Sequence, residues 1–128
     1  MITFEEVGEM LDEIALEIPQ EVYRELNGGI NLLPGEKFHP QSDNLTVDLY
    51  IMGEYYNEPY GLGRYIAIYY GSFIRLYAHS APEQQKERLR EVLHHEFIHH
   101  LESLAGENDL TVQDARDIAD YKRKWGIK

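Results

Sequence analysis

The sequence Val92-Leu93-His94-His95-Glu96-Phe97-Ile98-His99-His100-Leu101-Glu102 decides how this chain is interpreted. It contains the pattern His-Glu-x-x-His, formed by His95, Glu96 and His99. On an α-helix, residues four positions apart lie on one face, a single turn apart. Two imidazoles placed in this way can each bring a nitrogen to about 2.0–2.1 Å from one zinc ion. The Glu between them is close enough to deprotonate a water on that metal, so the segment predicts a helix that carries a zinc site.

The residues around this pattern divide the same helix into two faces. With about 100° per residue and His95 at zero, His99 lies near 40°, Glu102 near −20° and Glu96 near 100°, on the border. Five apolar residues gather at roughly 120° to 240°, on the opposite face: Leu89, Leu93, Phe97, Leu101 and Leu104. We therefore expect this helix to form the floor of a cleft, with its apolar face in the core.

Two further histidines flank the motif. We expect His94 to be exposed and His100 to be a structural histidine at the edge of the core. A competing interpretation treats the whole motif as the solvent-exposed face of an ordinary amphipathic helix, on which Glu91, His95 and Glu102 only form surface pairs.

The composition limits the class of protein. The chain has 128 residues, enough for one domain, and its content of 43% hydrophobic and 27% charged residues is typical of a folded protein. The net charge of −11 disfavours nucleic acid and anionic membranes as partners, because both are bound mainly through Lys and Arg. The absence of cysteine excludes disulfides, thiolate metal sites and cysteine nucleophiles. With neither a secretory signal nor an apolar run of about 20 residues, we expect a cytoplasmic protein.

The rest of the chain predicts a single α+β domain over residues 1–128. Thr3 and Glu6 form a capping box for a first helix, and Pro19 ends that helix and opens a short second one. We expect Gly106 to end the motif helix in the left-handed conformation. The expected elements are helices at 3–18, 73–77, 80–105 and 111–125, strands at 30–33, 47–52 and 65–70, and an exposed hairpin or loop at 53–63.

This order of elements resembles the minimal zincin-like metallopeptidase family of bacteria, which are small single-domain proteins with a His-Glu-x-x-His helix. The resemblance covers most of the chain, from the acidic N-terminal helix that begins Thr3-Phe4-Glu5-Glu6-Val7, through a strand ending at Tyr70 and Gly71, to the doublet His99-His100. It implies a zincin-like fold, in which a small mixed sheet packs on the active-site helix.

The resemblance also implies roles for individual residues. His95 and His99 match the family's zinc ligands, and Glu96 matches the general base of a metallopeptidase that hydrolyses peptide bonds with a metal-activated water. The expected substrate is a peptide or protein that extends along the strand 65–70, which we interpret as an edge strand. A Tyr or His of the Tyr-rich segment 55–70 is expected to stabilise the oxyanion.

The third metal ligand is where the sequence departs from the family. The family pattern His-Glu-x-x-His-x-x-Gly-x-x-Asp would place Gly where Glu102 stands, and the Gly-x-x-Asp spacing occurs four residues later, ending at Asp109. Asp109 is therefore the carried-over candidate, although it is also a good N-cap for the last helix. Glu102 is the alternative, because its side chain leans back toward the motif. Asp114 or Asp117 of the last helix, or no protein ligand, are the remaining options.

Two other functions are compatible with the sequence. The chain is either a non-catalytic binding or regulatory module that keeps the zincin frame, or an acidic structural domain without a metal. Glu96 favours the enzyme, because a purely structural metal site has no use for a general base.

Overall fold

Residues 1–38, 50–107 and 112–125 are described by the computed structural model. The elements along the chain are α1 (Phe4–Glu17), the short 3₁₀ helix η1 (Gln20–Tyr23), β1 (Gly29–Leu33), β2 (Gly53–Glu58), β3 (Gly63–Tyr69), α2 (Tyr70–Tyr77), α3 (Pro82–Glu107) and α4 (Val112–Trp125). The fold is thus α+β, as the sequence predicts. No helix in these ranges is long and apolar enough to cross a membrane.

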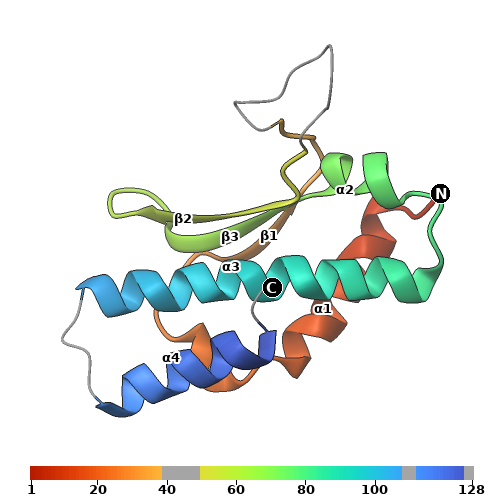
Figure 1. The fold of residues 1–128 in the computed structure, drawn as a ribbon. Helices are drawn as coiled ribbons and strands as arrows, with labels where there is room; N and C mark the ends of the chain where they lie inside the picture. Colours follow the sequence, from red (N-terminus) through yellow and green to blue (C-terminus); the bar gives the residue numbers. More distant parts are fainter. Residues whose placement is uncertain (39–49, 108–111, 126–128) are drawn as a thin grey trace.

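The three strands form a small mixed sheet in the order β1-β3-β2. β1 runs parallel to β3, and β2 runs antiparallel to it, with Tyr55 opposite Ile66 and Gly53 opposite Ile68. α3 lies along one face of the sheet, and α4 packs on the other side of α3 (Figure 1). The motif helix therefore lies between the sheet and the C-terminal helix.

The core forms where α1, the sheet and α3 meet. The apolar stripe predicted for α3 is confirmed, since Leu93 and Phe97 are fully buried and Leu89, Leu101 and Leu104 are at most 6% exposed. The capping box at the start of α1 is also confirmed, because Thr3 and Glu6 each accept a hydrogen bond from the other's backbone N–H. A stripe of apolar residues at helical spacing is thus enough to orient α3 correctly.

The strand predicted at 47–52 is wrong in position. Within its described part, Tyr50 forms only an isolated bridge to Phe38, and the strand β2 begins at Gly53, inside the segment predicted as a hairpin or loop. The two tyrosines of β2, Tyr55 and Tyr56, favour a strand, and antiparallel pairing with β3 completes it. Residues 47–49 lie outside the described ranges.

The expectation that 65–70 is an edge strand is also wrong. This segment is mostly β3, which is the central strand and pairs with β1 on one side and β2 on the other. Its backbone groups are used within the sheet, so a peptide has no free edge to extend there. β2 lies at the edge beside α3.

The left-handed helix end predicted at Gly106 is not observed. α3 continues through Gly106 to Glu107, and the glycines with positive φ in the described ranges are Gly29 and Gly63. The helix therefore extends beyond the motif by more than the sequence predicts.

Candidate metal site

The two motif histidines converge on one point. One turn of α3 separates His95 and His99, and their Nε2 atoms lie 3.1 Å apart. The rings stand edge to face, with centroids 4.6 Å apart and planes at 87°. Two nitrogens that each lie 2.0–2.1 Å from a tetrahedral zinc ion are separated by about 3.3 Å. The pair thus has the nitrogen type and the spacing that a shared zinc ion requires.

Glu96 lies beside this pair in a buried position. It is only 5% exposed, and its side chain lies close to β2, where a Cβ added to Gly53 would be 3.3 Å from its Cγ. Burial, together with a smaller effect of the negative charge of Glu54, raises the pKa of Glu96 to about 7. A carboxyl group with a pKa near neutrality can both accept and return a proton at physiological pH.

A groove runs between β2 and α3 and contains the three motif residues. Its volume is about 870 Å³, and it is lined by Ile51, Gly53, Glu54, Tyr55, Asn57, His95, Glu96, His99, Glu102 and Ser103. A smaller hollow of about 240 Å³ shares the wall formed by Gly53, His95 and Glu96 and extends to Arg88 and Val92. The edge strand and the motif helix therefore form the two walls of one open groove.

A second carboxylate, Glu54, is held on the β2 side of this groove. Its Oε1 accepts hydrogen bonds from Lys37 Nζ at 2.5 Å and from the hydroxyls of Tyr56 at 2.5 Å and Tyr69 at 2.8 Å. Although burial acts to raise it, the pKa of Glu54 is lowered by these three donors. Glu54 is thus a fixed negative charge near Glu96. No local sequence pattern points to it, because Lys37 and Tyr69 come from distant segments.

Tyr55 lines the groove, but its hydroxyl proton is used elsewhere. The Nε2–H of His100 donates to the backbone oxygen of Arg24 at 2.8 Å, so its Nδ1 accepts a hydrogen bond from the Tyr55 hydroxyl, also at 2.8 Å. Arg64 in turn donates to the Tyr55 oxygen at 3.0 Å. His100 is fully buried and serves the core, as the sequence predicts. This network leaves the Tyr55 hydroxyl without a free proton for an oxyanion.

The expectation that His94 is exposed is wrong. His94 is fully buried, and its Nδ1 lies 2.5 Å from the hydroxyl of Tyr121 on α4. On the helical wheel His94 lies outside the apolar stripe, so it would be exposed if no other element packed on that side of α3. α4 covers this side of α3, so the residue belongs to the core between the two helices.

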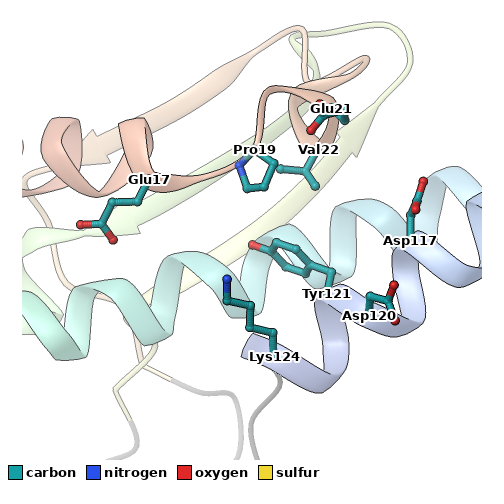
Figure 2. A pocket seen from close by; sticks show the side chains of 8 residues that line it. All are labelled: Glu17, Pro19, Glu21, Val22, Asp117, Asp120, Tyr121 and Lys124. Carbon is teal, nitrogen blue, oxygen red and sulfur yellow. The ribbon is translucent and has the colours of Figure 1, made fainter.

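The candidates for the third ligand are placed as follows. Asp109 and the side chain of Asp114 lie outside the described part of the chain. Asp117 lines a different hollow, of about 330 Å³, between the end of α1, η1 and α4 (Figure 2). Glu102 lines the groove, but its Oε1 lies 3.7 Å from Nδ1 of His99, on the side of the ring away from His95. Within the described residues, no third His, Asp or Glu joins the two histidines in a metal-binding group.

The chain is similar to a solved structure over most of its length. No family model matches the chain, and no curated protein matches it. Among solved structures, the chain is similar to a conserved hypothetical protein from Thermus thermophilus, with 32% sequence identity and a TM-score of 0.69. The match covers 83% of this chain and the whole of the other. The chain therefore belongs to the same family as this Thermus thermophilus protein.

Proposed function

We propose that this chain is a zinc-dependent peptidase with a zincin-like fold, in which His95 and His99 bind the metal and Glu96 is the general base. The observation that carries the proposal is the 3.1 Å separation of the two Nε2 atoms beside a buried carboxyl group, in an open groove. When bound, zinc would lower the pKa of a coordinated water and polarise the carbonyl of the scissile peptide bond.

Glu96 has the environment that a proton shuttle needs. In the proposed reaction it accepts a proton from the attacking water and returns it to the leaving amine, so that one residue serves as base and then as acid. Its pKa of about 7 suits both steps near neutral pH. Its burial between α3 and β2 also holds the carboxyl group in place relative to the histidines.

The proposed substrate is a peptide in extended conformation along β2. β2 is an edge strand, and its residues Gly53, Glu54, Tyr55 and Asn57 form one wall of the groove. A peptide that adds to this edge through main-chain hydrogen bonds passes over His95 and His99 on the opposite wall. This arrangement replaces the strand 65–70 as the expected binding site.

Two measurements test the proposal. Protein exposed to zinc and then desalted should contain one zinc per chain by elemental analysis, and the double variant His95→Ala/His99→Ala should contain none. His79→Ala, which removes an exposed histidine elsewhere, is the matched control and should keep the metal. Equal zinc in the double variant and the wild type would reject the site.

A peptide library then tests hydrolysis by the zinc-loaded wild type. Cleavage that disappears in the double variant supports the peptidase. The second candidate function is a non-catalytic zincin-like module, favoured by the hydroxyl of Tyr55 being used by His100 rather than free to stabilise an oxyanion. Full zinc occupancy without cleavage of any peptide would support this second function instead.

A further inference from the structure

Glu102 lies behind one of the two candidate ligands. It follows His99 by three residues on α3, and its Oε1 is 3.7 Å from Nδ1 of His99. The two ring nitrogens of an imidazole point in different directions. Because Nε2 of His99 faces His95, Nδ1 faces away from the position that a shared metal would occupy. Glu102 is therefore on the wrong side of the ring to be a ligand itself, but on the right side to contact the other nitrogen.

A lysine of the C-terminal helix binds the other oxygen of the Glu102 carboxylate. Nζ of Lys122, on α4, donates to Oε2 of Glu102 at 2.7 Å. The two oxygens of Glu102 thus face two different groups, the imidazole of His99 and the ammonium of Lys122. The contact between α3 and α4 therefore includes a residue, Glu102, that lies beside the candidate ligand His99.

The chemistry of neutral histidine gives this arrangement a role. A neutral imidazole carries its hydrogen on one nitrogen and a lone pair on the other, and only the second nitrogen binds a metal. A carboxylate beside Nδ1 favours the hydrogen there and leaves the lone pair on Nε2. At 3.7 Å the Glu102 carboxylate is within ion-pair distance of Nδ1, and a small movement of either side chain would bring it into the hydrogen bond through which such outer carboxylates typically change metal affinity by about 10–100-fold.

We propose that Glu102 is a positioning residue, which keeps the hydrogen of His99 on Nδ1 and directs Nε2 toward the metal, and that Lys122 fixes Glu102 from α4. The inference rests on the proposed zinc site at His95 and His99. It assigns to Glu102 a role other than the direct ligand considered from the sequence.

Zinc affinity is the first test, measured at pH 7 by competition with a chelating dye. Glu102→Gln should bind zinc about 10–100-fold more weakly than wild type. Glu87→Gln is the matched control, because it removes the same charge from an exposed position on α3, where Glu87 pairs with Arg90, and it should change the affinity by less than about threefold. Equal affinities for the two variants would overturn the inference. A wild type that binds no zinc would reject the proposed function and with it the inference.

Cobalt spectroscopy separates positioning from direct ligation. The visible spectrum of bound Co²⁺ depends on the atoms that coordinate it. When Glu102→Gln is saturated with Co²⁺, a positioning role predicts the spectrum of the wild type despite the weaker affinity. A changed spectrum would mean that Glu102 is a ligand, and would overturn the inference.

The role of Lys122 is tested by a double-mutant cycle with Lys122→Gln. Replacing Lys122 also removes a positive charge near the metal, but that effect is common to both backgrounds and cancels in the cycle. Lys122→Gln should therefore weaken zinc binding more in the wild type than in Glu102→Gln. Equal effects in both backgrounds would overturn the link to α4.

In the metal-free protein, ¹⁵N NMR should show the Nδ1–H form of His99 in the wild type and a loss of this preference in Glu102→Gln. The same mixture of the two forms in both proteins would contradict the inference.

Discussion

Nδ1 of His94 lies 2.5 Å from the hydroxyl oxygen of Tyr121, and this pair joins the motif helix to α4 inside the protein. His94 is fully buried and Tyr121 is 7% exposed. Burial lowers the pKa of His94 to about 4 and raises the pKa of the Tyr121 hydroxyl. The residue next to the first candidate ligand is thus a neutral, buried part of the packing between α3 and α4.

His94 should make the fold sensitive to acid. Its pKa is depressed in the folded state, so between pH 6.5 and 4 the unfolded chain binds a proton that the folded chain does not. The contribution of His94 to the free energy of unfolding therefore falls by about 2 kcal/mol between pH 7 and 5, whereas Glu96, whose pKa burial raises to about 7, shifts the free energy of unfolding in the opposite direction. Urea unfolding of the wild type and of a variant without His94, each at the two pH values, measures this contribution as a difference.

The control for this prediction is His94→Gln, which keeps a polar side chain but does not titrate. This variant is expected to lose less stability than the wild type between pH 7 and 5, whatever its stability at pH 7. The same pH dependence in both proteins would show that His94 is not the group responsible.

Phe97→Ala should strongly destabilise the fold. Phe97 is fully buried and packs edge to face on Tyr23, with ring centroids 5.0 Å apart. Truncation of a buried Phe costs about 3–5 kcal/mol, which chemical denaturation would detect. Leu16→Ala is the comparison, because Leu16 is 89% exposed, and it should change stability by less than about 0.5 kcal/mol. Similar losses in the two variants would mean that α3 is rotated from the described orientation.

Glu96→Gln should separate metal binding from catalysis. The amide has the shape of the carboxyl group but cannot accept the proton, so any peptidase activity should fall at least about 100-fold. Zinc content should stay near that of the wild type, because the ligands His95 and His99 are unchanged. Cleavage at the rate of the wild type would contradict the role of general base, and loss of zinc would make Glu96 a ligand.

Gly53→Ala should disturb the wall of the groove. A Cβ at this position would lie 2.8 Å from Cγ1 of Val92, a branched side chain on a helix, and 3.3 Å from Cγ of Glu96. We expect a loss of about 1–3 kcal/mol in the free energy of unfolding, measured in urea. Gly35→Ala is the control, since nothing lies within 4 Å of its added Cβ, and its stability should be close to that of the wild type. Equal stability of the two variants would contradict the described contact between β2 and α3.

The sequence by itself determined the features that depend on spacing within one helix. The convergence of His95 and His99 follows from their separation of four residues, and the burial of Phe97 follows from its place in an apolar stripe. The capping box of Thr3 and Glu6 is equally local. Such features can be predicted because the geometry of a helix is the same in any protein.

Only the tertiary structure decided which neighbours reach this helix. His94 became a core residue because Tyr121, 27 positions away, covers it, and Glu102 faces Nδ1 of His99 while Lys122 of α4 holds its other oxygen. The edge strand of the groove was decided by the pairing of β2 with β3, which no local pattern specifies. Long-range packing and strand pairing depend on the whole chain, because each needs two segments whose mutual position is set by folding.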